Sequence, residues 1–318
     1  VYLKCSLIRN SSKMELNRYV VEFRSKQFGS RHSLLHILKM ASEKYKLART
    51  TLHLAMYLLD YFMDNFTIRQ DKLNLTALTC LIVAGKIEEA DVDMPKFTQL
   101  NELIGGSYEL ADFKSVECKL LTTLNFDLLR PTSATFAEYF ANFCLTLDDY
   151  HLYMQNWHTG LFDFHTLQLP PLYTSYEEML LSLNKRMFYL IDMTLNYYKF
   201  ANVRPSILAA ACLAAGRQLH NILPMWTTYL EALTGYKEHT IRSYVEALVT
   251  LHKLNNAVVN CEGPAAAVST VLCDSPDSGI VSCDMKCSQS SAEESADNDE
   301  GGRCSCADYP IAKKRRLC

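Results

Sequence analysis

The segment spanning residues 71–86, with the sequence DKLNLTALTCLIVAGK, constrains the fold more than any other part of the chain. It is long enough for a helix and is apolar nearly all round, and a helix without a polar face belongs in the interior of a bundle. Residues 51–64 have the same character. We therefore expect these two helices at the centre of a helical bundle, with Asp71 capping the start of the second.

Composition favours the same fold class. Only 11 of the 318 residues are glycine and nine are proline, which is too few for the frequent turns of a sandwich or barrel. Hydrophobic residues make up 49% and charged residues 21%, and this balance excludes disorder of the whole chain. The net charge of −3 gives no reason to expect direct nucleic-acid binding. No uncharged apolar run reaches about 18 residues, so we expect no membrane partner.

Further helices are expected on both sides of the interior pair. In the first half they cover residues 31–46 and 112–124. In the second half, which begins with Thr132 after Arg130-Pro131, they cover residues 132–146, 178–199, 206–219, 225–234 and 238–253. Residues 147–177 contain Pro170-Pro171 and are expected to form a less regular insertion. Each half then has about five helices with an apolar one in the middle.

Composition changes sharply near residue 255. Residues 256–318 contain seven of the 12 cysteines, many serines and an acidic run from Glu293 to Glu300. Such a segment buries too little apolar surface to offset its ordering entropy, so we expect a disordered tail. The start of the chain shows no signal-peptide layout, so the cysteines are expected to be reduced thiols. The first residue is valine, and we expect a fragment whose true start lies upstream.

Three stretches of the first half share their order and spacing with a known family. They are Thr51 to Asp60, Leu81 to Glu89 (LIVAGKIEE) and Thr123 to Leu128 (TLNFDL). Together they resemble the cyclin box across residues 31–130, and Arg130-Pro131-Thr132 resembles the family's entry into its second box. The insertion and the details around Asp60 and Pro95-Lys96 look most like the J-type cyclins. Residues 131–255 resemble a cyclin C-terminal domain by helix layout, and residues 1–30 form an N-terminal extension.

The resemblance implies an all-α protein with two tandem five-helix cyclin-box domains followed by a disordered C-terminal tail. It implies a non-catalytic subunit without a cofactor, which binds and activates a cyclin-dependent Ser/Thr kinase in cell-cycle regulation. In that role a cyclin pushes on the kinase's mobile helix and completes the kinase's catalytic Lys–Glu ion pair. No phosphate loop, kinase Gly-rich loop or His-Glu-x-x-His motif occurs in the sequence, and no catalytic residue is expected.

The resemblance also assigns roles to single residues. The pair of charges that faces the kinase falls on Lys86 and Glu117, and the flanking contacts fall on Val83, Ile87, Cys118 and Leu121. A structural ion pair falls on Arg31 and Asp60. Without the family pattern, the simpler interpretation is that Lys86 reaches water and Glu117 is a solvated helix residue. Asp60 stands between leucines and aromatic residues, where a carboxylate needs a partner.

The sequence departs from cell-cycle cyclins at their hydrophobic docking groove for Arg-x-Leu peptides. The corresponding positions hold Ser30, Arg31, Ser33, Leu34 and Ile37, with Leu73 and Asn74 on a later helix. Two apolar anchors have become serine and a tryptophan has become isoleucine. Because apolar burial supplies most of such a groove's affinity, we expect weak or no docking of these peptides.

Gly85 and Ile87 replace the usual serine and phenylalanine on either side of Lys86. A helical glycine costs roughly 1 kcal/mol relative to alanine but lets a partner approach closely. These positions leave two alternatives open: a cyclin that binds a kinase without activating it, and a transcription-type cyclin-fold scaffold that binds other partners. A scaffold of that kind is expected to have a basic face on its second domain, and no basic concentration occurs there.

Two features of the tail carry separate expectations. Lys313, Lys314, Arg315 and Arg316 form a basic cluster that suits nuclear import, so the predicted location is the nucleus, with the cytoplasm as a second location. Cys283, Cys287, Cys304 and Cys306 have spacings that fit no common zinc module, and no metal site is expected.

Overall fold

The computed structural model describes residues 19–90, 93–106, 108–160 and 171–261, with side chains up to residue 257. Within these ranges the regular structure consists of helices alone, in agreement with the expected fold class. Residues 1–18 and 262–318 lie outside the described residues, and so does most of the tail expected from residue 256. The last described helix continues to Cys261, so the expected helical end at residue 253 was too early.

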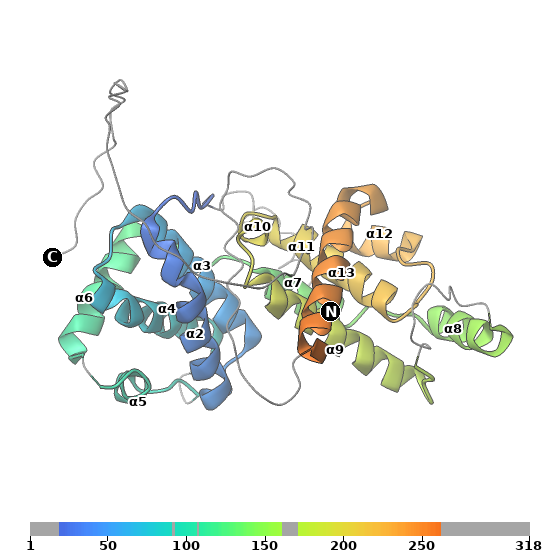
Figure 1. Ribbon diagram of the computed structural model, residues 1–318, viewed down its shortest axis with the longest axis horizontal. Coiled ribbons are helices and arrows are strands. Elements are labelled where there is room, and N and C mark those ends of the chain that lie inside the picture. Colours follow the sequence, from blue (N-terminus) through green and yellow to red (C-terminus); the bar gives the residue numbers. More distant parts are fainter. Residues whose placement is uncertain (1–18, 91–92, 107, 161–170, 262–318) are drawn as a thin grey trace, which may run out of the picture. The chain divides into compact units, whose positions relative to one another are not determined.

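The N-terminal bundle has five α-helices, and the label α4 in Figure 1 marks the one that the others surround. They are α2 (Arg31–Tyr45), α3 (Arg49–Asn65), α4 (Leu73–Glu88), α5 (Phe97–Glu102) and α6 (Leu110–Thr123), with the short 3-10 helices η1 (Lys26–Ser30) and η2 (Gln70–Lys72). Helix α4 contacts α2, α3, α5 and α6. The prediction that the all-apolar segment lies inside a bundle is therefore confirmed.

Burial along α4 explains why its sequence lacks a polar face. Side chains on every side of the helix are buried as far as Gly85, and Lys86 is the first exposed residue. The expected cap was wrong: α4 begins at Leu73, and its N-cap Lys72 makes no side-chain cap. Asp71 lies one residue earlier in η2 and pairs instead with Arg69 at 2.9 Å.

The C-terminal bundle is organised around a helix of small residues, α11 (Pro205–Leu219), which contacts α7 and α9. Pro205 stands at the first turn, where the missing N–H is no loss. The other helices are α7 (Ser133–Phe140), α8 (Leu147–Thr159), α9 (Tyr176–Thr194), α10 (Tyr198–Ala201), α12 (Thr228–Thr234) and α13 (Glu238–Cys261). Two expected helices were too long, because α7 ends at Phe140 and α9 ends at Thr194.

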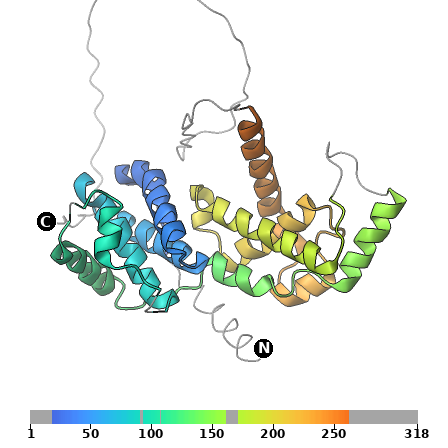
Figure 2. The ribbon, with the colours of Figure 1, turned by 90° about the horizontal axis from the view of Figure 1, so that it is seen from below.

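Helix α8 lies in the segment that was expected to be irregular, so that expectation was wrong for residues 147–159. The helix lies at the outer edge of its bundle in both Figure 1 and Figure 2. It starts with a capping box: the Thr146 hydroxyl accepts from the backbone N–H of Asp149, whose carboxylate accepts from the N–H of Thr146. This Thr-x-x-Asp pattern is visible in the sequence from Thr146 to Asp149.

A buried ion pair fixes α8 to the bundle core. Arg217 of α11 is fully buried and donates to both carboxylate oxygens of Asp149, at 2.7 and 3.1 Å. The same guanidinium also donates to the backbone carbonyls of Cys144 and Pro224. Burial alone would raise the pKa of Asp149, but the hydrogen bonds from Arg217 hold it below its usual value.

The segment that precedes η1 runs along residues of both bundles. Val21 donates its N–H to the Asn202 side-chain oxygen at 3.0 Å and accepts from the Asn202 amide nitrogen at 2.8 Å. The ring of Phe23 packs on Phe28 and on Tyr198. One asparagine side chain thus satisfies both backbone groups of an extended residue, as a neighbouring strand would.

None of the helices in the described part of the chain is long and apolar enough to cross a bilayer.

Candidate functional site

Lys86 and Glu117, the two charges that the resemblance assigns to the kinase-facing surface, meet on the surface of the N-terminal bundle. Their side chains come from the end of α4 and the middle of α6, and the Lys86 Nζ to Glu117 Oε1 distance is 2.5 Å. The Lys86 side chain is 56% exposed and that of Glu117 is 22% exposed. The pair is therefore accessible to a partner, and Lys86 is the first of the two charged residues, Lys86 and Glu88, that follow the buried stretch of α4.

The predicted flanking residues differ in how much surface they offer. Cys118 is exposed, while Ile87 and Leu121 are half-buried beside the charged pair. Val83 packs in the hydrophobic core and is only 2% exposed. In the structure as it stands, Val83 supports the surface from beneath and offers a partner almost no contact area.

Two large apolar residues just beyond α6, neither of them among the predicted site residues, are exposed. Phe126 is 69% exposed and Leu129 is 62% exposed. Asn125 and Phe126 both have positive φ, 49° and 58°, and the Phe126 N–H donates to the Leu121 carbonyl at 2.9 Å. The left-handed turn closes α6 and directs a large aromatic side chain into water. Positive φ is uncommon for residues other than glycine. Asn followed by Phe at a helix end was the available sequence signal.

Gly85 makes room for a residue of the same chain. A Cβ at this position would lie 2.2 Å from the Met94 sulfur and 2.6 Å from its methyl carbon. Because the obstructing atoms are the far end of a flexible side chain, the clash is one that Met94 can relieve by moving. The close approach expected of this glycine is therefore provided by Met94, and a second protein is not needed to explain it.

Glu89 connects the end of α4 to the start of α3. Its carboxylate Oε1 accepts from the Ala48 N–H at 2.6 Å and from the Thr51 hydroxyl at 2.5 Å. Ala48 is the N-cap of α3 and has no capping side chain of its own, so Glu89 satisfies an otherwise open helix end. The position of Lys86, one turn earlier on α4, is thereby tied to α3.

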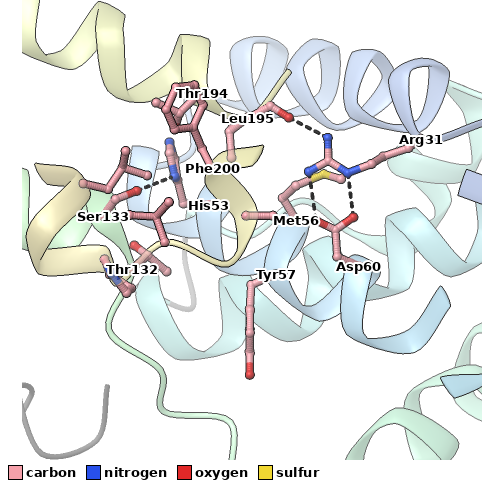
Figure 3. A pocket seen from close by; sticks show the side chains of 14 residues that line it. Arg31, His53, Met56, Tyr57, Asp60, Thr132, Ser133, Thr194, Leu195 and Phe200 are labelled. Atoms are coloured by element: carbon pink, nitrogen blue, oxygen red, sulfur yellow. Dashed lines mark hydrogen bonds and ion pairs between the residues drawn. The ribbon is translucent and has the colours of Figure 1, made fainter. Parts of the chain in front are cut away.

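Arg31 and Asp60 form the predicted structural pair (Figure 3). Two parallel hydrogen bonds of 2.8 Å join the guanidinium to the carboxylate, and both side chains are about 95% buried. Arg31 also donates to the Leu195 carbonyl at 2.6 Å, which links α2 to the C-terminal bundle. Burial alone would lower the pKa of Arg31, but the Asp60 carboxylate raises it above the ordinary value.

His53 lies near Arg31 and contacts both bundles (Figure 3). Its Nδ1 is 3.4 Å from the Ser133 hydroxyl, and its Nε2 is 3.2 Å from Asp192 Oδ1. Arg49 donates to the same carboxylate at 2.9 Å. Burial alone would raise the pKa of Asp192, but His53 and Arg49 hold it below its usual value.

Serine, histidine and aspartate here share the residue types of a hydrolytic triad, but the geometry is different. The ring nitrogens are used in the reverse order, with Nδ1 toward serine. Ser133 is buried, and the adjacent cavity of about 40 Å³ has room for little more than a water molecule. The arrangement is a contact between helices and has no space for a substrate.

The residues aligned with the peptide-docking groove offer little apolar surface. Leu34 and Leu73 are core residues with 1% and 2% exposure, and Ile37 and Asn74 are half-buried. Ser33 is exposed and Ser30 is half-buried, so the outer positions are polar.

In the part of the chain that the structure describes, no three metal-ligating side chains gather into a potential metal site. The tail cysteines Cys283, Cys287, Cys304 and Cys306 lie outside the described residues. The basic cluster Lys313 to Arg316 lies outside them as well.

Comparison with known proteins identifies the family. Residues 5–129 match the N-terminal cyclin domain, and residues 172–262 match the C-terminal cyclin domain. The chain therefore belongs to the cyclin family, whose members are non-catalytic regulatory subunits of protein kinases.

Two relatives illustrate the degree of similarity. The chain is 31% identical to Cyclin-J of Xenopus laevis over 233 residues, which is 72% of this chain and 56% of the relative. It is 29% identical to the Cyclin-J-like protein of Mus musculus over 229 residues, 70% of this chain and 55% of the relative. The chain thus spans about half the length of the curated relatives it matches.

A solved viral cyclin from herpesvirus saimiri has the same fold. The structures superpose with a TM-score of 0.55 at 18% identity, covering 77% of this chain and 96% of the viral chain.

Proposed function

We propose that this chain is the regulatory subunit of a cyclin-dependent Ser/Thr kinase and acts in cell-cycle regulation. The observation that carries the proposal is the accessible Lys86–Glu117 pair at the junction of α4 and α6. A charged pair in reach of solvent, beside half-buried apolar residues, suits a specific interface with a polar component.

The apolar part of the proposed interface comes from Ile87, Leu121 and Phe126. Phe126 is 69% exposed, so a partner can bury most of its side chain. Its burial against a partner would contribute about 1.5–3 kcal/mol before ordering costs. Lys86 and Glu117 then set the orientation of the bound kinase, because an orientation that leaves either charge buried and unpaired costs binding free energy.

The proposed mechanism is a rearrangement of the kinase. A rigid face that packs on the kinase's mobile helix holds it inward, where its glutamate completes the catalytic Lys–Glu ion pair. The ties from Glu89 and Arg31 keep α4 and its neighbours from moving when that force is applied.

Co-purification with a panel of cyclin-dependent kinases, followed by a phosphotransfer assay, tests the proposal. Lys86→Glu and Glu117→Lys should each reduce kinase binding by about tenfold or more, since each places two like charges together. The double exchange Lys86→Glu with Glu117→Lys restores the internal pair. It should recover folding stability fully and binding only in part. Lys185→Glu and Glu177→Lys, which change exposed charges on α9, are the matched controls.

The results separate the alternatives. Absence of binding to every kinase would contradict the proposal, and binding insensitive to both reversals would contradict the site. Stable binding without phosphotransfer would instead identify a cyclin that occupies a kinase without activating it, whereas the cyclin-fold scaffold predicts no kinase binding.

We also propose that Arg-x-Leu peptides dock weakly or not at all. The apolar anchors that such a groove needs are either serine or already packed in the core, as Leu34 is. Fluorescence polarisation with a labelled Arg-x-Leu peptide should show no saturable binding, and Ile37→Trp should increase the signal. Tight binding that Leu34→Ala abolishes would contradict this proposal.

The proposed location is the nucleus, with Lys313, Lys314, Arg315 and Arg316 as the import signal. A fluorescent fusion should accumulate in the nucleus, and changing these four residues to alanine should redistribute it. Nuclear accumulation unaffected by the change would exclude this cluster as the signal.

A further inference from the structure

A groove between α2 and α9 is distinct from the proposed kinase face. One wall consists of Lys39, Ser42, Glu43 and Lys46, and the other of Tyr189, Asp192, Met193 and Asn196. Each set follows the spacing i, i+3, i+4, i+7, and its first three residues share one face of the helix. Lys46 is the C-cap of α2, and Asn196 lies two residues beyond the end of α9. Leu47 and Leu52 add apolar surface, and the cavity volume is about 580 Å³. That is large enough for several side chains of a bound segment.

Charges in the groove are unequally satisfied. Arg49 and Asp192 pair with each other at 2.9 Å. In the described part of the chain, no carboxylate oxygen lies within 4 Å of the Lys39 or Lys46 ammonium. Lys39 makes one long contact, 3.4 Å to the Asn196 oxygen, although an ammonium can donate three hydrogen bonds. Burial lowers the pKa of Lys39, as expected for a cation that lacks a close anion.

A second polar group in the groove lacks a partner. Ser42 is 7% exposed, and its buried hydroxyl makes no hydrogen bond. A buried hydroxyl without a partner is destabilising unless something binds to it. Ser42 stands one turn from Lys39 on the same face of α2, so two unsatisfied donors line the same wall.

We propose that this groove docks an acidic peptide segment of a partner protein, with a Glu or Asp carboxylate on Lys39 and an apolar neighbour on Met193 and Leu52. The two lysines and Glu43 leave one net positive charge, which matches a single carboxylate. A phosphate dianion fits less well, because Asp192 and Glu43 lie in the same groove and would repel it. The Asn196 amide already contacts Lys39 and the Met193 carbonyl, and the Asn255 oxygen accepts from the Tyr197 hydroxyl, so the proposed recognition rests on Lys39 and the apolar residues.

The test uses the free chain and no kinase, so its result is independent of the proposed function. The probe is acetyl-Gly-Leu-Glu-Leu-Gly-amide, titrated into full-length protein labelled at its methionine methyl groups. The Met193 methyl resonance should shift with saturation, while that of Met40, which is exposed on α2, should not. Lys39→Met keeps the aliphatic stem and should weaken binding about tenfold, whereas Lys44→Met on the same helix should leave it unchanged.

If Lys39 serves binding, Lys39→Met should leave the thermal midpoint of unfolding equal or higher, because it removes a half-buried unpaired charge. A purely structural role for Lys39 predicts a lower midpoint instead. Equal binding of the Gln-for-Glu peptide, no shift at Met193, or unchanged affinity of Lys39→Met would each overturn the proposal. If a peptide in which phosphoserine replaces the glutamate bound more tightly, the groove would be a phosphate site and the proposed carboxylate ligand would be wrong.

Discussion

Each bundle encloses one arginine that is paired with an aspartate and almost inaccessible to water. Arg31 pairs with Asp60 in the first bundle, and Arg217 pairs with Asp149 in the second. Both guanidinium groups also donate to backbone carbonyls, although the buried Nε of Arg217 has no hydrogen-bond partner in the described part of the chain. Such pairs contribute mainly by fixing one arrangement, because desolvation offsets much of their attraction.

Removing one partner of the Arg31–Asp60 pair leaves a buried charge uncompensated. Arg31→Ala or Asp60→Ala should lower the free energy of unfolding by about 3–5 kcal/mol, measured by urea denaturation. The double change should cost less than the sum of the two single changes. Arg69→Ala, which breaks the exposed pair with Asp71, is the control and should have little effect. Additive losses for Arg31 and Asp60 would show that the pair is not coupled.

His220 should make stability depend on pH. Burial lowers its pKa from 6.5 to about 4, and its Nδ1 is 2.6 Å from the Tyr173 hydroxyl. Between these two values the unfolded chain binds a proton that the folded chain does not. The contribution of neutral His220 to the free energy of unfolding is therefore fully present above about pH 6.5. It is lost as the pH falls toward 4, by up to about 3 kcal/mol.

The measurement compares urea unfolding of wild type and His220→Asn from pH 7 to pH 4. The difference in stability between the two proteins should narrow as pH falls, while His158→Asn, at an exposed position, should follow wild type throughout. A constant difference would show that His220 titrates normally in the folded protein.

Glu89 illustrates how one element positions another. α3 starts at Arg49 without a capping side chain of its own, and a glutamate from just beyond α4 accepts from its first turn. We expect Glu89→Ala to lower the free energy of unfolding by about 1–2 kcal/mol, because it opens a helix N-terminus and frees the Thr51 hydroxyl.

Hydrogen exchange provides the local readout for this change. The Ala48 amide should exchange faster in Glu89→Ala than in wild type. Glu88→Ala, at the exposed neighbouring position, is the matched control and should change neither quantity. Equal stability of the two variants would mean that water replaces the Glu89 cap without cost.

Helices could be predicted from the sequence where burial is periodic along the chain. The prediction failed where a capping interaction determines where a helix starts. The interior helices were predictable because residues 51–64 and 71–86 leave no polar face for water, whereas Arg31 was assigned to Asp60 through the family resemblance. α8 was missed because its start depends on the capping box at Thr146 and its anchor on Arg217, 68 residues further along from Asp149. The exposure of Phe126 depends on two positive φ angles, and the helical periodicity of α6 carries no information about them.

At the scale of the whole molecule, the described part of the chain holds its two bundles together with a small number of polar contacts. Arg49 and His53 of α3 meet Asp192 of α9, and Arg31 reaches the end of the same helix at Leu195. The ring of Phe188 also lies under the Arg49 guanidinium at 4.5 Å. Asp192 is the only carboxylate among these contacts, so it is the position at which they are most easily broken.

Asp192→Ala should reduce the cooperativity between the bundles. Both tryptophans, Trp157 and Trp226, lie in the C-terminal bundle, so their fluorescence follows that bundle while far-UV circular dichroism follows both. In wild type the two urea transitions should coincide, and in Asp192→Ala they should separate. Glu177→Ala, at an exposed position on the same helix, should retain coincident curves. Coincident transitions in Asp192→Ala would show that other contacts suffice.

The amide of Asn202 has a practical consequence for producing this protein. A chain shortened to begin at Arg31, the start of the cyclin-box helices, would lose Val21 and Phe23 together. Asn202 would then lose both backbone partners, and the ring of Tyr198 would be uncovered. Such a trimmed protein should be harder to keep in solution than one that starts before Tyr19, even though no cyclin-box helix has been removed.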